Sequence, residues 1–138
     1  MRRLFFFLLF ILPVLANSAV TQPPKDRGDY TSLFLEGNKL MEEKLWMEAI
    51  KQWKTILETD PNNPNVNYKM GYCLLQTTSS KKEALSYLEV AVAKKVSKNY
   101  DAFDPMERKA PVDALYYLGL AQHLNYQLDQ AIESFEKV

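Results

Sequence analysis

The side chains that could do chemistry in this 138-residue chain are few and lie far apart. His123 is the single histidine and Cys73 the single cysteine, so neither has a partner at the spacing that a zinc site requires. Asp101 and Asp104 are three residues apart, but the segment around them lacks the alternating acids and central glycine of a calcium-binding loop. We therefore expect a non-catalytic chain with no metal site and no cofactor. His123 is expected on a helix surface and Cys73 in the core.

The composition argues against binding to nucleic acid or to phosphate. The chain has 17 basic and 17 acidic residues, and from Val20 onward its net charge is −2, which gives no basic surface. The four glycines are scattered, so no glycine-rich phosphate loop is present. We expect a protein or peptide partner, with no nucleic acid and no small-molecule substrate.

The first residues are typical of a secretory signal peptide. Met1-Arg2-Arg3 precedes an apolar run from Leu4 to Ala16. The small residues at the end of this run predict cleavage after Ala16 or Ala19. An uncleaved membrane anchor is the alternative, but the run is short and contains Pro13, whereas spanning a bilayer takes roughly 20 residues. We assign 1–19 to the signal peptide and the proline-containing segment 20–29 to a linker.

The rest of the chain has the apolar periodicity of helices. Apolar residues recur at helical steps between Leu45 and Glu58, Asp60-Pro61 ends that helix, and Asn63 with Pro64 starts the next one. Ser80 and Glu83 have the spacing of a capping box for a further helix. Six helices in three antiparallel pairs are predicted, with no strand, so the expected fold class is all-α.

Small residues recur at a fixed distance. Gly37 and Gly71 are 34 residues apart, Ala49 follows Gly37 by 12 residues, and Ala131 follows Gly119 by 12 residues. One small residue on each helix of a pair indicates that the helices touch at these points.

This pattern resembles the tetratricopeptide repeat family, whose unit is a 34-residue helix-turn-helix. The resemblance implies repeats over 30–63, 64–98 and 112–138, the last one incomplete, and an insertion over 99–111 that adds a short helix or fills a gap between repeats. Because the third unit stops in mid-helix, we expect the sequence to be the N-terminal part of a longer protein. The residues that match the structural positions of the repeat are Gly37, Ala49, Trp53, Pro61, Gly71, Ala84, Gly119, Ala131 and Phe135.

The resemblance also implies a binding groove, which the first helix of each repeat lines in that family. The implied groove residues are Phe34, Asn38, Tyr68, Tyr72, Tyr116 and His123. This aromatic and nearly uncharged set suits an extended peptide or a partner helix. Phe34 stands where members that clamp a carboxylate have lysine, which argues against that subtype. The alternative is that the set packs against the insertion or the chain's own tail.

A narrower resemblance covers 107–138, which looks like the N-terminal repeat segment of bacterial cell-envelope proteins with a downstream β-propeller and OmpA-like domain. With the signal peptide, it implies an exported interaction or scaffold module in the periplasm or at the outer membrane. One alternative is a structural spacer that positions a peptidoglycan-binding domain outside this sequence. Another is an enzyme subunit whose catalytic groups lie elsewhere.

Overall fold

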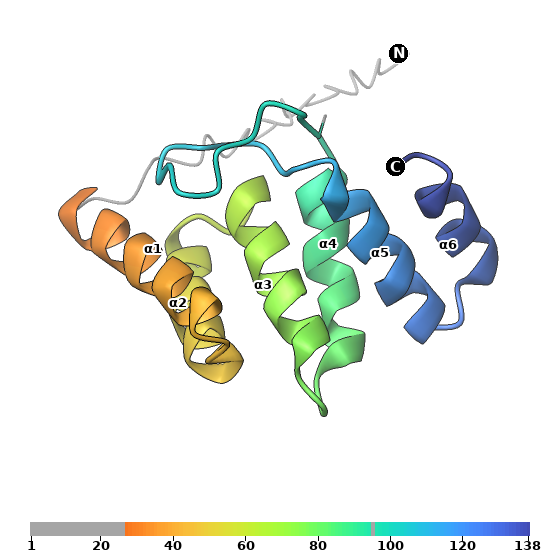
Figure 1. The fold of residues 1–138 in the computed structure, drawn as a ribbon, viewed down its shortest axis with the longest axis horizontal. Helices are drawn as coiled ribbons and strands as arrows, with labels where there is room; N and C mark the ends of the chain where they lie inside the picture. Colours follow the sequence, from red (N-terminus) through yellow and green to blue (C-terminus); the bar gives the residue numbers. More distant parts are fainter. Residues whose placement is uncertain (1–26, 95) are drawn as a thin grey trace, which may run out of the picture.

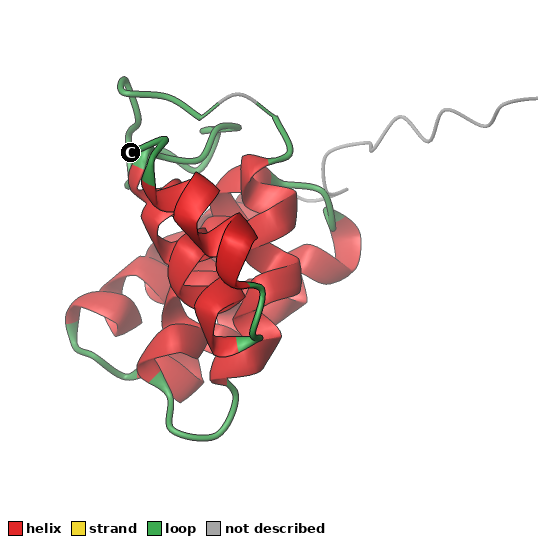
Figure 2. Cartoon of the chain, turned by 90° about the vertical axis from the view of Figure 1, so that its right-hand side faces the viewer, coloured by secondary structure: helices red, strands yellow, loops and turns green. Residues whose placement is uncertain are grey.

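The computed structural model describes residues 27–94 and 96–138, which form a row of three antiparallel helix pairs (Figure 1). The elements are α1 (Arg27–Glu42), α2 (Trp46–Thr59), α3 (Pro64–Gln76), the short 3-10 helix η1 (Lys81–Glu83), α4 (Ala84–Val92), α5 (Asp113–Leu124) and α6 (Leu128–Phe135). Helices and loops account for the whole described part, apart from an isolated bridge between Ser97 and Pro111 (Figure 2). The prediction of an all-α helical solenoid is confirmed.

The structure describes only part of the N-terminal region for which the sequence makes predictions. The signal peptide predicted over 1–19 lies outside the described residues, as does most of the linker. Helix α1 begins at Arg27, inside the predicted linker 20–29. Asp29 lies in its first turn, where a carboxylate interacts favourably with the helix dipole. Within the described residues, no helix is both long and apolar enough to cross a membrane.

The junction between α2 and α3 follows its local sequence. The last turn of α2 closes with a bond from the Asp60 N–H to the Ile56 carbonyl, and Pro61 prevents the helix from continuing. The Asn63 side chain then accepts hydrogen bonds from the N–H groups of Asn65 (3.1 Å) and Val66 (3.4 Å). With Pro64 at the first helical position, α3 starts where the sequence predicted.

The capping box predicted at Ser80 and Glu83 is wrong. The Ser80 side chain makes no capping bond, and Glu83 belongs to η1. Thr77 organises this turn instead, because its hydroxyl donates to the Leu74 carbonyl (2.7 Å) and accepts from the Ser80 N–H (3.3 Å). The Thr77 hydroxyl therefore shapes the turn that precedes η1.

Each helix pair is closed by a glycine that faces a large side chain. A Cβ atom on Gly37 would lie 2.5 Å from the Trp53 ring, one on Gly71 would lie 2.5 Å from Leu88 Cγ, and one on Gly119 would lie 2.5 Å from Phe135 Cε1. The second helix of each pair adds a buried alanine, at Ala49, Ala84 and Ala131. These small residues allow the paired helices to pack closely and support a continuous core centred on Trp53, Phe34 and Leu88.

Candidate functional site

The six predicted groove residues lie on the first helices of the three pairs and differ in exposure. On α1, Phe34 is fully buried and Asn38 is 6% exposed. On α3, Tyr68 and Tyr72 are half-buried, whereas Tyr116 (46% exposed) and His123 on α5 face solvent. The α1 end of the predicted groove is therefore closed, and the α3 and α5 end is open.

The insertion covers the closed end. Residues 99–111, here called the loop, form turns rather than the short helix that was one of two expectations. In Figure 1 the connection from α4 to α5 extends back across α3 to α1. The Asn38 amide donates to the Ala102 carbonyl (3.1 Å), and the Tyr100 ring packs edge-on to Tyr68 with centroids 6.1 Å apart. Of the six predicted groove residues, Asn38 and Tyr68 therefore contact the insertion.

A buried lysine lies beneath the loop and was missed by the sequence reasoning. Lys69 on α3 is 2% exposed, and its Nζ donates to Asn38 Oδ1 (2.7 Å) and to the Ala102 carbonyl (2.9 Å). Nζ also lies 5.2 Å from the Phe34 ring centroid and 5.7 Å from that of Trp53. Burial lowers the pKa of Lys69 to about 8. The sequence feature that could have indicated this position is that Lys69 is the one charged residue within α3.

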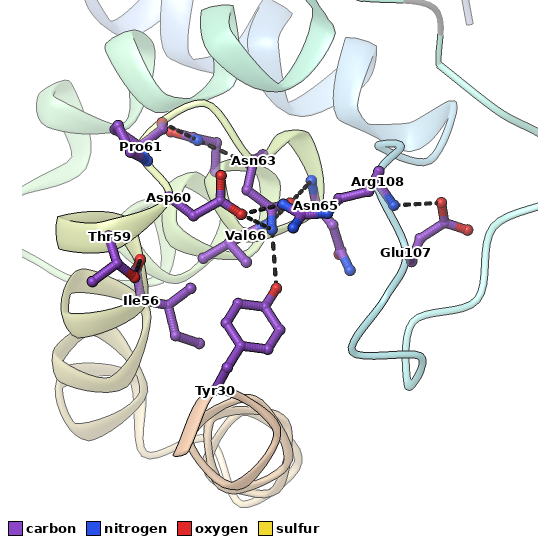
Figure 3. A network of polar contacts seen from close by, with 11 residues as sticks. Tyr30, Ile56, Thr59, Asp60, Pro61, Asn63, Asn65, Val66, Glu107 and Arg108 are labelled. Carbon is purple, nitrogen blue, oxygen red and sulfur yellow. Dashed lines mark hydrogen bonds and ion pairs between the residues drawn. The ribbon is translucent and has the colours of Figure 1, made fainter. Parts of the chain in front are cut away.

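A second charged contact fastens the far end of the loop. The Arg108 guanidinium donates to the carboxylate of Asp60, which is buried at the turn between α2 and α3 (Figure 3). The same turn holds Asn63, whose amide donates to Asp60 Oδ2 (3.1 Å) and to the Tyr30 hydroxyl (3.0 Å). Through this network the loop is connected to the turn and to α1.

The open end of the groove is a cluster of tyrosines. The tyrosine cluster consists of Tyr68 and Tyr72 on α3 and Tyr116 and Tyr117 on α5, with ring centroids 5.0 Å apart for Tyr72 and Tyr117 and 5.4 Å apart for Tyr116 and Tyr117. Trp46 packs edge-on to Tyr72 at 5.9 Å. Burial raises the pKa of Tyr68 and Tyr117, so their hydroxyls remain protonated hydrogen-bond donors. Tyr117 was not among the predicted groove residues, although it directly follows Tyr116, which was.

The other candidate chemical groups have structural roles in this fold. Asp101 and Asp104 accept hydrogen bonds from the N–H groups of Phe103 (2.9 Å) and Met106 (2.8 Å), which shapes two turns of the loop. Cys73 is buried, and burial raises the pKa of its thiol to about 12. Across 27–94 and 96–138, no group of three or more His, Cys, Asp or Glu side chains could hold a metal ion.

Comparison with known protein families gives a match for the last helix pair. Residues 113–138, which include α5 and α6, match the family model of the tetratricopeptide repeat. No curated protein matches the chain. The match covers the last helix pair, and the two preceding pairs have the same antiparallel arrangement (Figure 1). Stacked helical repeats generally form concave surfaces that bind other proteins.

Proposed function

Because the final helix pair matches a tetratricopeptide repeat, a family that generally mediates contacts between proteins, we propose that this chain is a non-catalytic module that binds an extended peptide or a partner helix on its concave face. The observation that carries the proposal is the tyrosine cluster. Its rings lie on two neighbouring helices and are partly exposed, so they offer a ready apolar surface.

Tyrosine suits this role for physical reasons. Each ring offers a large apolar area, and its hydroxyl can bond a peptide backbone. The ring contacts of Tyr117 with Tyr68 (6.1 Å) and Tyr72 (5.0 Å) limit the rotamers of these side chains before a ligand arrives. Binding then costs less conformational entropy than on flexible side chains.

The proposed contact surface is smaller than the groove implied by the sequence. It consists of Tyr72, Tyr116, Tyr117 and His123, because Phe34 is fully buried in the core and Asn38 is bonded to the loop. Tyr68 is at the boundary, since one side of its ring contacts Tyr100 and another contacts Tyr72.

For location, we propose export to the periplasm or the outer membrane of a bacterial cell envelope. This rests on the signal peptide predicted over 1–19 and on the resemblance of 107–138 to envelope proteins with an OmpA-like domain. The second candidate function is a spacer that positions such a domain and binds nothing itself. The loop supports this alternative, because its Ala102 carbonyl already accepts the hydrogen bond that the Asn38 amide could donate to a ligand.

The two candidates are separated by a binding experiment. Peptides selected on the purified chain from a displayed random library are expected to bind a Tyr72→Ala/Tyr116→Ala variant at least about tenfold more weakly, because two aromatic contacts are lost. Binding is measured by calorimetry, and circular dichroism checks that helicity is retained. Tyr126→Asn is the matched control, because Tyr126 is 81% exposed beside Lys82 and asparagine tolerates its φ of 62°. Equal affinity for all three proteins, or a library that yields no peptide, would favour the spacer.

A further inference from the structure

We propose that the loop is an internal ligand, and that the site beneath it also takes an extended peptide from a partner protein with the same recognition groups. This inference rests on the proposed function, because it adds a second peptide subsite next to the tyrosine cluster. It concerns the closed end of the groove, where Asn38, Asn65, Lys69 and Asp60 are all buried.

Three separate contacts fix the loop on the helices. The Tyr100 hydroxyl donates to Asn65 Oδ1 (2.6 Å), the Ala102 carbonyl accepts from Asn38 and Lys69, and Arg108 donates to Asp60. The contact at Ala102 is to the main chain, so any peptide can supply it. The other two specify an aromatic hydroxyl two residues before that carbonyl and an arginine six residues after it.

The loop holds its own shape between these contacts. Asp101 and Asp104 each accept a main-chain N–H two residues further on, and Glu107 accepts those of Arg108 (2.9 Å) and Lys109 (3.0 Å). Where the loop joins the body, the Ser97 N–H bonds the Ala110 carbonyl (2.9 Å). The loop is thus a self-structured segment that is docked on α1 and α3 rather than built into them.

The docked loop leaves part of the site unused. Asn65 Nδ2 is buried and has no hydrogen-bond partner, although Asn65 Oδ1 is bonded to Tyr100. Lys69 is buried and forms no ion pair among the described residues. A peptide with one more acceptor near Asn65, or an acidic group near Lys69, would make contacts that the loop does not make. The structure therefore points to a partner that can replace the loop.

Tethering sets how strongly a partner must bind. A segment joined by short connections acts as if its concentration were about 1 mM, so it outcompetes a free peptide that makes the same contacts. A partner that also occupies the tyrosine cluster gains the extra affinity needed to displace the loop. The site beneath the loop and the tyrosine cluster would then bind the same partner together.

The test uses the loop's own sequence as the probe. In one variant of the full chain, residues 99–109 are replaced by a glycine-serine linker of equal length, which keeps Ala110. The synthetic peptide NYDAFDPMERK is expected to bind this variant at least about tenfold more tightly than it binds the intact chain, because the intact site is filled. Peptides with phenylalanine for the tyrosine or glutamine for the arginine should bind about tenfold more weakly, and a scrambled peptide should not bind.

A second variant keeps the test valid if the linker chain does not fold. Tyr100→Phe/Arg108→Gln retains the whole loop but removes its two side-chain contacts, and it should also bind the peptide more tightly than the intact chain does. No binding to either variant, provided at least one is folded by circular dichroism, would overturn the proposal, as would equal binding to variant and intact chains. Adding Tyr116→Ala to the linker variant should leave NYDAFDPMERK binding unchanged, so failure here and failure at the tyrosine cluster are distinguishable.

Discussion

Replacing Gly37 with leucine is expected to reduce the free energy of unfolding by about 3 kcal/mol, although leucine is the better helix former. A Cβ atom at Gly37 would lie 2.5, 2.7 and 2.8 Å from three atoms of the Trp53 ring. That ring cannot move aside easily, since it is fully buried and Phe34 packs edge-on to it with centroids 5.6 Å apart. The added side chain must therefore separate α1 from α2. Urea denaturation followed by circular dichroism measures the loss.

Gly119→Leu is the matched control for this prediction. Its obstacle is Phe135, which is 38% exposed on the outermost helix and can turn towards solvent. We expect a loss of about 1 kcal/mol there. If the two leucine variants lose the same free energy, or if Gly37→Leu is as stable as the parent, close packing of the first helix pair is not what requires glycine.

Between pH 8 and pH 10, the stability of the parent chain is expected to rise relative to that of Lys69→Met. The folded chain holds the pKa of Lys69 at about 8, below the value of 10.5 for a free lysine. In this range the unfolded chain keeps a proton that the folded chain has released, and stability then increases with pH. The full span between the folded and unfolded pKa values corresponds to about 3 kcal/mol, and the difference between the two proteins should level off about one pH unit below the folded pKa of Lys69.

The comparison is made as a difference because other groups act in the opposite direction. Burial raises the pKa of Cys73 from 9.0 to about 12 and also raises that of Tyr68 and Tyr100, so each of these groups reduces stability once the unfolded chain ionises. They are present in both proteins and largely cancel. Denaturation curves between pH 7 and pH 10 measure the effect, with Lys39→Met as an exposed-lysine control. A difference that does not change with pH would show that burial does not lower the pKa of Lys69 in the folded chain.

The helix pairs could be predicted because their signals are local. The end of α2 at Pro61 and the start of α3 at Asn63 and Pro64 depend on groups within a few residues, and apolar periodicity marks the buried side of each helix. The error at Ser80 shows the limit of such signals, since the spacing of Ser80 and Glu83 fits a capping box although the Ser80 side chain makes no capping bond.

The closed end of the groove could not be predicted because its contacts are distant in the sequence. Asn38 bonds Ala102 across 64 residues, and Asp60 pairs with Arg108 across 48 residues. No periodicity connects these positions, and an insertion can pack in many ways. The charge of Lys69 inside an otherwise uncharged helix indicated an unusual position, but not the carbonyl that it binds.

The most direct test of peptide binding on the concave face is an NMR titration of the isotope-labelled chain with a peptide selected from the displayed library. The proposal predicts that the largest shift changes fall on α3 and α5 around Tyr72, Tyr116 and Tyr117, with smaller changes in the loop. Changes concentrated on α2 and α4, or no saturable change with any selected peptide, would contradict it.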